Sequence, residues 1–461
     1  MAKVLFVIPG TIFRHEPLGV MYLSSVLKEA GHETDLVIDG EEDLLATVRR
    51  FKPDVVGFSV TTGSQARAIE LSNRIKGALS DTILCVMGGP HATFFPEVIY
   101  EEGVDGVCRG EGELAMLELA NRLDANQDIT NIANWWIKMG GQVFKNPVRP
   151  LIENVDAIPF PDRDLVAKYR RFSRCRVKHF ITARGCPFDC SYCFNHAYRR
   201  LYRGKGKAVR RRSVDNVIEE IEEVRDKYDI ALVYFSDDTF NILPQWVEEF
   251  VEKYRERIGL PFTCNLRADL VTPQMIRGLK EAGCVSILMG VETGNERLRI
   301  QLLKRRITDE QIVAACKLIK EQGMALLLYN ILGLPTTELQ HDLETLKFNA
   351  RCAPDYAWAS LFQPFPGTEL GELSRKLGQF DGDINRLDPT FHKRSAIELP
   401  HKREVENLHK LFALLVQFPF LRPLMMVLIK VPNRGPIGLL YRGLFLLWKW
   451  YRYKTKIMPG I

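Results

Sequence analysis

Three cysteines stand close together near the middle of the sequence, at Cys186, Cys190 and Cys193. Their spacing is C-x3-C-x2-C, and no fourth cysteine follows nearby, the next being Cys264. Cysteine thiolates are the ligands that hold iron–sulfur clusters, and one short loop can place three of them around a cubane. Most cubane clusters have four cysteine ligands. Three would leave one iron of a four-iron four-sulfur cluster open to a ligand that is not protein.

The residues around these cysteines resemble the cluster loop of the radical S-adenosylmethionine (SAM) enzymes. Gly185 and Pro187 flank the first cysteine, and the aromatic Tyr192 precedes the last. The resemblance implies that the three cysteines ligate the cluster and that the open iron binds the amino and carboxylate groups of SAM. An electron from the cluster then cleaves SAM. A zinc knuckle or a chance group of buried thiols is the alternative interpretation of the spacing alone.

The composition is that of a globular protein with two or three domains. The chain has 461 residues, of which 46% are hydrophobic and 26% are charged, so each domain can bury a core. No secretory signal peptide opens the sequence, and the ten cysteines then indicate a reducing compartment, where thiols do not pair. The net charge of +6 is mild and predicts no nucleic-acid partner. We therefore expect a cytoplasmic protein.

Strands alternate with helices over about the first 120 residues. Buried strands are predicted at 4–9, 34–38, 54–60, 82–87 and 106–108, and helices at 19–30 and 64–79. This alternation predicts a doubly wound parallel sheet, whose ligands bind beyond the carboxyl ends of the strands. Glycines and other small residues follow these ends, and they let a ligand approach the backbone closely.

This half of the chain resembles the Rossmann-like cobalamin-binding domain found ahead of many radical SAM enzymes. The matching segments are 17–23, 57–59, 88–93 and 109–113. The resemblance implies that cobalamin is bound by residues at the strand ends, namely Ser59, Thr61, Gly88, Gly89, His91, Gly110, Glu111 and Gly112. A flavodoxin-like domain that binds no ligand is the alternative.

The lower axial ligand of cobalt is one departure from other cobalamin proteins. Those of the mutase and methionine synthase type supply a histidine from the motif D-x-H-x-x-G. Here His15 precedes Gly19 with one residue too many, and no aspartate stands two positions before it. The resemblance therefore implies cobalamin without a histidine below the cobalt. We expect His91 to line the corrin face or a phosphate pocket rather than to bind the metal.

A second series of strands follows a proline-rich stretch. Strands are predicted at 180–183, 232–235, 262–267, 286–292 and 325–331, with helices between them, one of which spans 213–228 and is capped by Ser213. Repeated strand–helix units predict a TIM-type barrel with its chemistry at the C-terminal strand ends, and the resemblance implies a partial barrel of six units. The expected divisions are a cobalamin-binding domain at 1–140, a linker at 141–171, a radical SAM core at 172–395 and a helical extension at 396–461.

Charged residues stand at the ends of these predicted strands. Asp237 and Asp238 follow one strand, Arg267 ends the next, and Glu292 ends the one after. A carboxylate can accept from an ammonium group or a ribose, and a guanidinium offers a planar fork to a carboxylate. By resemblance these residues bind SAM, the aspartates near its amine, Arg267 near its carboxylate and Glu292 near its other polar groups, with the backbone of Tyr192 near the adenine. Any one of them alone could be a salt bridge or a helix cap.

Basic residues gather in two places. Eight Lys and Arg residues between 199 and 212 suit cofactor phosphates or an anionic substrate, and equally a solvated loop. From Leu408 the sequence becomes apolar, but its runs at 418–429 and 439–454 fall short of the roughly 20 uninterrupted apolar residues of a spanning helix. Aromatic residues beside Lys and Arg are typical of an interfacial helix, which would place the protein at the inner face of the membrane. A helical cap on the barrel is the alternative.

Together the resemblances imply a cobalamin-dependent radical SAM methyltransferase that methylates an unactivated carbon. Its expected cofactors are a four-iron four-sulfur cluster, SAM and cobalamin, and no catalytic base can be named. The expected partners are an electron donor such as flavodoxin or ferredoxin and a small-molecule substrate, which is a lipid, isoprenoid or tetrapyrrole if the tail binds membrane. The alternatives are an oxidative cyclase or hydroxylase resembling the anaerobic magnesium-protoporphyrin monomethyl ester cyclase, and a cobalamin-binding sensor without catalysis.

Overall fold

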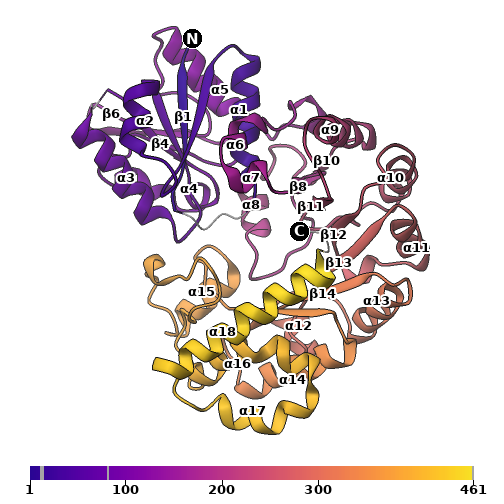
Figure 1. Cartoon of the computed structure of the whole chain (residues 1–461). Coiled ribbons are helices and arrows are strands. Elements are labelled where there is room, and N and C mark those ends of the chain that lie inside the picture. Colours follow the sequence, from indigo (N-terminus) through magenta and orange to yellow (C-terminus); the bar gives the residue numbers. More distant parts are fainter. Residues whose placement is uncertain (11–14, 80–81, 459–461) are drawn as a thin grey trace. The chain divides into compact units, whose positions relative to one another are not determined.

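The computed structural model describes residues 1–10, 15–79 and 82–458. These residues form two compact units (Figure 1). The first contains Met1–Arg174 together with Tyr198–Ala208, and the second contains Cys175–Ala197 and the residues from Val209 onward. Residues 198–208 therefore belong to the first unit, although the second unit begins earlier in the sequence, at Cys175.

The first unit is built on one sheet, which has seven strands within the described residues, in the order β2-β1-β3-β4-β5-β6-β7. The strands are β1 (Lys3–Ile8), β2 (Glu33–Ile38), β3 (Val55–Ser59), β4 (Leu84–Gly88), β5 (Gly106–Cys108), β6 (Trp135–Met139) and β7 (Gln142–Lys145). The first five are parallel, whereas β6 and β7 run antiparallel as a hairpin at the edge. The carboxyl ends of β3, β4 and β5 therefore lie side by side.

Helices cover both faces of this sheet. They are α1 (Leu18–Glu29), α2 (Leu44–Phe51), α3 (Gln65–Ala78), α4 (Pro90–Phe94) and α5 (Glu113–Asp124), with a 3-10 turn, η1, at Pro96–Tyr100. Leu5 and Val7 pack with residues of α2 and α3, while Phe6 and Met116 of α5 lie against Gly57 on the other face. Because both faces are covered, the strands are continuous apolar runs in the sequence. The predicted doubly wound sheet is confirmed.

The sequence predicts a linker at 141–171 because of its prolines. In the structure these residues, and those up to Arg174, lie within the first unit. After β7 they form three short helical turns, η2 (Val155–Ala157), α6 (Asp164–Ala167) and α7 (Arg170–Ser173). The Tyr169 hydroxyl donates to the Leu36 carbonyl at 2.8 Å and accepts from the Ile38 amide at 3.0 Å, both on the edge strand β2. Buried Arg163 pairs with Glu16 at 2.8 Å. These contacts bind the segment to the sheet.

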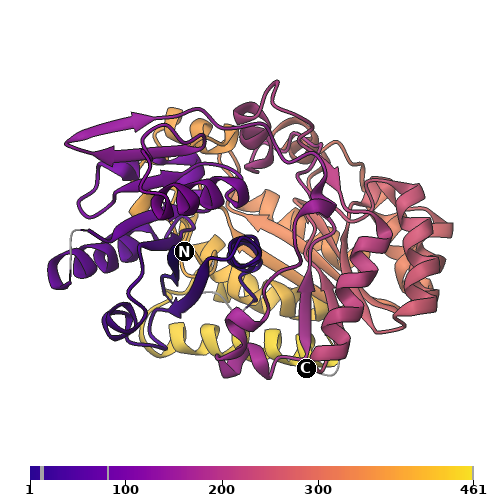
Figure 2. The same ribbon diagram turned by 90° about the horizontal axis from the view of Figure 1, so that it is seen from above.

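The second unit is a partial barrel, with six parallel strands in the described part of the chain, in the order β8-β11-β12-β13-β14-β15. The strands are β8 (Val177–Phe180), β11 (Leu232–Phe235), β12 (Phe262–Leu266), β13 (Cys284–Glu292), β14 (Ala325–Leu332) and β15 (Tyr356–Leu361). The helices between them are α9 (Val214–Lys227), α10 (Pro244–Arg257), η3 (Ala268–Leu270), α11 (Pro273–Glu281), α12 (Glu296–Gln301), α13 (Asp309–Glu321) and α14 (Leu339–Cys352). Figure 2 shows the longer of these helices on the outer side of the strands.

The start of this barrel differs from the sequence prediction. The first strand was expected at 180–183, but β8 begins at Val177, because Lys178 is buried with its ammonium group 5.2 Å from the Tyr228 ring. The chain then forms β9 (Ala183–Arg184), which pairs antiparallel with β10 (Arg210–Arg211), and α8 (Asn195–Leu201) lies between them in sequence. The predicted cap of α9 is present, since the Ser213 hydroxyl accepts from the Asn216 amide at 3.2 Å.

The C-terminal residues complete the second unit. They form α15 (Glu369–Lys376), η4 (Ile384–Arg386), α16 (Lys402–Gln417), η5 (Pro419–Leu421), α17 (Arg422–Leu428), α18 (Gly435–Arg452) and a π-helical turn, η6, at Tyr453–Ile457. Helix α16 packs on β15 through Leu408, Phe412 and neighbouring apolar residues. Ile457 and Met458 pack with Val177, Leu232 and Leu327, near the N-terminal ends of their strands, so the tail fills the base of the barrel. No helix among the residues that the structure describes has both the length and the apolar character needed to cross a membrane.

Deleting residues 453–461 should destabilise the second unit. The deletion removes the buried Ile457 and Met458 side chains and the Ile457 carbonyl, to which the buried Ser286 hydroxyl donates at 2.7 Å. We expect a loss on the order of 5 kcal/mol, measured as a lower midpoint of urea unfolding. The exposed substitution Lys456→Ala should leave the midpoint unchanged. An unchanged midpoint in the truncated protein would show that the tail is not part of the barrel core.

Candidate active site and cofactor sites

The cysteine loop has almost no regular secondary structure and is held by hydrogen bonds to its neighbours. The Ser191 amide donates to the Leu303 carbonyl at 3.0 Å, and the Ser191 hydroxyl donates to the Leu302 carbonyl at 2.6 Å. The Ser191 carbonyl accepts from the Leu370 amide at 3.0 Å. The Cys193 amide donates to the Cys190 carbonyl at 3.1 Å, which closes a turn between two of the cysteines. The loop is therefore fixed at its centre by two distant parts of the same unit.

The three thiols lie in partly buried surroundings. Burial raises the pKa of Cys186, and it raises the pKa of Cys193 to about 11. The Asn195 side-chain amide contacts the Cys193 sulfur at 3.4 Å and the Asp238 carboxylate at 3.0 Å. Within the described residues, no three His, Cys, Asp or Glu side chains converge as the ligands of a single metal ion would. A cubane needs no such convergence, because each thiolate ligates a different iron. One buried and two half-buried thiols on one loop fit a cluster of this kind.

Asp237 joins the end of β11 to the start of the cysteine loop. One of its carboxylate oxygens accepts from the Thr182 amide at 2.9 Å, the Thr182 hydroxyl at 3.1 Å and the Ala183 amide at 2.6 Å. The other oxygen is buried and has no hydrogen-bond partner in the structure. Burial raises the pKa of this carboxyl group, against the opposing charge of Arg211. Asp238, by contrast, is exposed. The two adjacent aspartates therefore differ in their surroundings: Asp237 is buried and holds the start of the cysteine loop, whereas Asp238 is exposed.

Glu292 occupies a strained position at the end of β13. Its φ is +67°, in the left-handed region that is costly for any residue except glycine, and the pairing with β14 is irregular at this point. Burial raises the pKa of Glu292, while the charge of Arg305 and a hydrogen bond from Tyr192 lower it. The Arg305 guanidinium also donates to the Gly290 carbonyl at 2.9 Å. Arg305, which the sequence did not single out, thus supports the strand end and places a positive charge near Glu292 and Cys190.

Arg267 is less available than the sequence predicts. It is buried, its guanidinium stacks 3.5 Å from the Phe188 ring, and Nε lies 2.8 Å from the Asp269 carboxylate. Buried Asn241 holds the backbone, accepting from the Arg267 amide at 2.9 Å and donating to its carbonyl at 3.1 Å. The fork of Arg267 is therefore already oriented by its own neighbours. Asn241 had no sequence signal apart from being polar in an apolar stretch.

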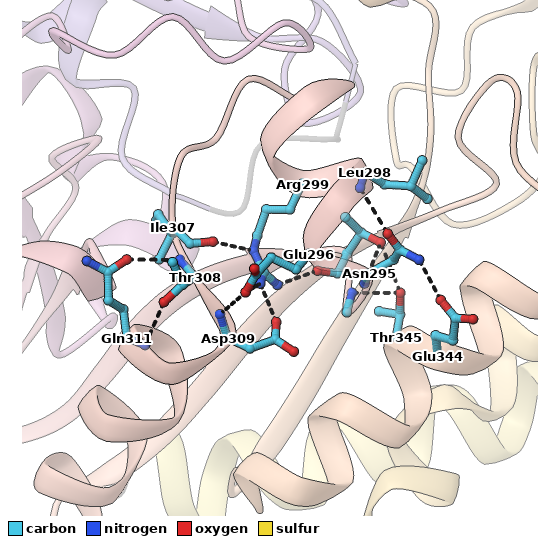
Figure 3. Close-up of polar contacts among 12 residues, drawn as sticks. Asn295, Glu296, Leu298, Arg299, Ile307, Thr308, Asp309, Gln311, Glu344 and Thr345 are labelled. Carbon is cyan, nitrogen blue, oxygen red and sulfur yellow. Dashed lines mark hydrogen bonds and ion pairs between the residues drawn. The ribbon is translucent and has the colours of Figure 1, made fainter.

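A fully buried arginine supports the loops behind Glu292 (Figure 3). Arg299 donates to the Thr293 carbonyl at 2.8 Å and to the Ile307 carbonyl at 2.9 Å, and it pairs with Asp309. Nearby, the Asn295 side chain donates to Glu344 at 2.7 Å. These contacts close the segment from 293 to 309 on itself. Because that segment carries Leu302 and Leu303, Arg299 supports the two carbonyls that hold Ser191.

The predicted cobalamin residues of the first unit lie at the carboxyl ends of β3, β4 and β5. Ser59 ends β3, and Thr61 begins a turn in which its carbonyl accepts from the Ser64 amide at 3.0 Å. His91 is buried in the short helix after β4, and its Nδ1 lies 3.2 Å from the Thr62 hydroxyl. Burial lowers the pKa of His91 to about 4, so the ring is neutral at pH 7. A neutral rim of hydroxyl and backbone groups fits the amide-bearing periphery of a corrinoid.

The glycines at this edge serve different purposes. A Cβ on Gly89 would meet the Val60 carbonyl oxygen at 2.9 Å, and one on Gly110 would meet the Tyr202 hydroxyl at 1.8 Å. Both have positive φ, +93° and +79°, so glycine is needed there for the protein's own packing. Gly88 differs, because a Cβ there would meet only Cys108 at 3.9 Å. Gly88 is thus the glycine that leaves space at this edge.

Tyr202 was not predicted from the sequence. It is buried, and its hydroxyl accepts from the Glu111 amide at 2.9 Å. The Glu111 carboxylate itself accepts from the Ile152 amide at 3.1 Å, and Gly112 directly precedes α5 with Leu23 against its Cα. The only sequence signal was the pair Tyr198 and Tyr202 at helical spacing, whose rings lie 4.8 Å apart. The segment after the cysteine loop therefore supports the end of β5.

Several cations of the basic segment 199–212 have structural partners. The Arg211 guanidinium lies 3.7 Å from the Trp246 ring, and buried Arg212 pairs with Glu220. The Lys205 ammonium donates to the Val148 carbonyl. Arg203 and Lys207 are exposed. His15, for its part, is exposed and adjoins residues 11–14, which lie outside the described chain.

Comparisons with known proteins agree with this division into two cofactor sites. A model of the B12 binding domain matches residues 11–120, and a model of the radical SAM superfamily matches residues 180–348. An uncharacterized methyltransferase from Pyrococcus horikoshii is 32% identical over 390 residues, which are 81% of this chain and 83% of that protein. The chain belongs to the cobalamin-dependent radical SAM family.

Other relatives in this family carry different activities in their names. The anaerobic magnesium-protoporphyrin IX monomethyl ester cyclase of Rubrivivax gelatinosus is 28% identical and shares 88% of this chain and 75% of its own length. The hopanoid C-3 methylase of Methylococcus capsulatus is 26% identical and shares 77% of this chain and 68% of its own. Membership of the cobalamin-dependent radical SAM family therefore identifies an enzyme, and its relatives include proteins named as methylases and as cyclases.

The fold is also shared with a solved structure. The radical SAM methyltransferase TsrM from Kitasatospora setae, with tryptophan and a SAM analogue bound, aligns over 99% of this chain and 100% of its own with a TM-score of 0.70 and 16% identity. A second TsrM structure holds cobalamin and a [4Fe-4S] cluster. With the two domain matches, these likenesses support the predicted cofactors, which are cobalamin, SAM and a four-iron four-sulfur cluster.

Replacing Arg299 should weaken the second unit. The Arg299→Met substitution leaves the Thr293 and Ile307 carbonyls without this donor and removes the buried partner of Asp309, and we expect a loss of about 3 kcal/mol in the free energy of unfolding. Arg297→Met on the same helix is the matched control, because Arg297 is exposed. Urea unfolding of both variants decides the matter. Equal midpoints for the two would contradict a supporting role for Arg299.

The neutral state of His91 should make the protein's stability depend on pH. Its pKa is about 4 in the folded chain and ordinarily 6.5, so below pH 6.5 the unfolded state binds a proton that the folded state does not. The stabilisation is complete above pH 6.5 and falls by about 3 kcal/mol as the pH drops to 4. His91→Gln should therefore lose less stability than the wild type between pH 6.5 and about 4.5. Urea unfolding at both pH values measures this, and parallel losses would refute it.

Proposed function

We propose that this enzyme transfers a methyl group from SAM to an unactivated carbon of a small hydrophobic substrate. The observation that carries the proposal is a three-cysteine loop, fixed by its neighbours, in the same chain as a cobalamin-type domain. When bound, the cluster supplies an electron for the cleavage of SAM, and cobalamin supplies a carrier for the methyl group. The residues of this chain hold and orient these groups.

Cys186, Cys190 and Cys193 are the proposed cluster ligands. Burial keeps Cys186 and Cys193 in the thiol form at pH 7, so the binding of iron must release protons from the loop. The other seven cysteines lie elsewhere in the two units, and six of them are buried. The anchored centre of the loop, at Ser191, keeps the thiols in place while one iron stays free of protein ligands.

SAM is proposed to contact the strand ends around this loop. The unpartnered oxygen of Asp237 and the exposed carboxylate of Asp238 suit the ammonium group, and the preoriented fork of Arg267 suits the carboxylate. Glu292 and the backbone of Tyr192 suit the ribose and adenine. The strain at Glu292 supports a functional role, because a costly backbone conformation persists where the site requires it.

Cobalamin is proposed to bind at the carboxyl ends of β3, β4 and β5. The candidates are the residues predicted from the sequence, Ser59, Thr61, Gly88, Gly89, His91, Gly110, Glu111 and Gly112. The open face of Gly88 and the neutral His91 support this site most directly.

The overall reaction replaces one C–H bond of the substrate with a C–CH3 bond. The methyl group comes from one SAM molecule, and the hydrogen atom leaves with the 5′-deoxyadenosyl part of another. An external donor such as flavodoxin or ferredoxin supplies the two electrons that the reaction needs, because two positively charged SAM molecules become uncharged products. No side chain is needed as a base in this scheme, because hydrogen leaves the substrate as an atom.

A hydrophobic substrate is supported by the names of two relatives, the hopanoid C-3 methylase and the protoporphyrin monomethyl ester cyclase. The second candidate function, oxidative cyclisation or hydroxylation of a tetrapyrrole, is favoured by the 28% identity to the cyclase over most of both chains.

The test uses anaerobically reconstituted, chemically reduced protein. It should hold about four iron atoms and convert SAM into 5′-deoxyadenosine, and the Cys186→Ala/Cys190→Ala/Cys193→Ala variant should do neither. Cys175→Ala, at a half-exposed cysteine outside the loop, is the control and should keep both properties. With SAM that carries a deuterated methyl group, the product mass should show one transferred methyl group.

Two results would overturn the proposal in different ways. A full cluster in the triple variant would remove the assignment of the ligands. A product that gains oxygen or loses hydrogen, without label, would replace methyl transfer by oxidation and leave the cluster assignment standing.

A further inference from the structure

Helices α17 and α18, drawn in yellow tones in Figure 1, carry apolar side chains that are exposed to solvent. Leu439, Leu447 and Trp450 of α18 are 71%, 68% and 61% exposed. Other exposed apolar side chains lie on α18, on α17 and on the turn before it, namely Phe420, Leu424, Val427, Leu440 and Leu446. Scattered single leucines on a surface are ordinary, but a group of this size on two consecutive helices marks a binding site. We call this surface the α17–α18 face.

The opposite side of α18 is packed, so the exposed side is not an accident of a loose helix. The Tyr441 hydroxyl donates to the Leu428 carbonyl at 3.0 Å, and Arg452 donates to the Asp355 carbonyl at 2.6 Å. Phe445 lies against the rings of His392 and His409 at 5.3 and 5.2 Å. Positions 441, 445, 448 and 452 lie on one side of a helix, which fixes its rotation. Leu440, Leu447 and Trp450 then point away from the barrel.

The charge around this face is of one sign. No Asp or Glu follows Glu406 in the sequence, whereas the chain has 57 of them in all, and the same stretch contains nine Lys and Arg residues. Five of these cations are exposed beside the face: Lys430, Arg434, Arg442, Lys454 and Lys456. A basic border around leucine and tryptophan matches a surface whose headgroups are anionic and whose interior is apolar.

We propose that the α17–α18 face binds the surface of an anionic lipid bilayer. The leucines and Trp450 enter the boundary between headgroups and acyl chains, and the cations contact the anionic headgroups. Because η6 continues from α18 into the base of the barrel, the helix is a rigid part of the second unit rather than a flexible anchor. The inference stands independently of the proposed methyl transfer, although it agrees with a substrate that dissolves in lipid.

A second copy of the chain fits this face less well. A two-fold symmetric contact would place the same surface of both copies together, and the five exposed cations of each would meet with no carboxylate after Glu406 to pair with them. Such an arrangement of like charges is repulsive. The bilayer has the complementary charge, which the face itself lacks.

The test measures binding of the full-length holoenzyme to phosphatidylglycerol–phosphatidylcholine vesicles by sedimentation. Leu439→Gln/Leu447→Gln should lower the partition constant of the protein onto the vesicles about tenfold or more, because two apolar side chains no longer enter the apolar region of the bilayer. Leu114→Gln/Leu243→Gln makes the same change at two other exposed leucines, one in α5 and one just before α10, and should bind like the wild type. Arg442→Gln/Lys454→Gln should weaken binding and reduce its dependence on salt.

Two further measurements separate lipid binding from other causes. Tryptophan emission should shift to the blue when vesicles are added, and Trp450→Phe should abolish most of the shift. SAM cleavage should be unchanged in Leu439→Gln/Leu447→Gln, which shows that the variant is folded and keeps this result apart from the fate of the methyl-transfer proposal. The inference is overturned if wild type and Leu439→Gln/Leu447→Gln bind vesicles equally, if the wild type does not bind, or if it is a dimer that the same variant converts into a monomer.

Discussion

A loop without helix or strand can bind a cluster only if the rest of the protein fixes its backbone. Here that constraint is met by hydrogen bonds from a few residues, with Ser191 at the centre and Asp237 at the entry. Both residues form hydrogen bonds with segments that are distant in the sequence. Ser191 donates to the carbonyls of Leu302 and Leu303, and Asp237 accepts from the amides of Thr182 and Ala183. The thiols therefore depend on strand ends that contain no cysteine.

The same demand explains the buried polar residues behind the site. A carbonyl removed from water needs a donor, and a long cation can satisfy several at once. Arg299 does so for Thr293 and Ile307, and Arg305 donates to Gly290 while it places a positive charge near Cys190. These side chains cost free energy to bury, and their effect is to give irregular loops a single conformation. The chemistry of the site is thus supported by residues that need not touch a cofactor.

The fold was predicted correctly where a local sequence pattern, such as an apolar run or a helix-capping residue, specified an element. Apolar runs ending in glycine or aspartate gave most strands of both units, and Ser213 gave a helix start. Strand β8 was misplaced because Lys178 is buried, and the hairpin β6–β7 was not predicted at all. In the candidate site, the cysteines and Glu292 could be proposed from the sequence because residue type and spacing are local. Tyr202, Asn241 and Arg305 could not, because their roles arise from contacts with residues far away in sequence.

The return of residues 198–208 to the first unit bears on how such enzymes can be recombined. An exchange of domains between relatives would seem to need one junction, near Arg174. That junction would leave Tyr202 of one parent against the Gly110–Glu111 turn of the other, where a mismatch removes the hydroxyl that accepts from Glu111. A working chimera must therefore carry 198–208 with the N-terminal half, through two further junctions, one within α8 before Tyr198 and one after Ala208. In evolution, substitutions in this short segment must stay compatible with the first unit, although the segment follows the start of the second unit in the sequence.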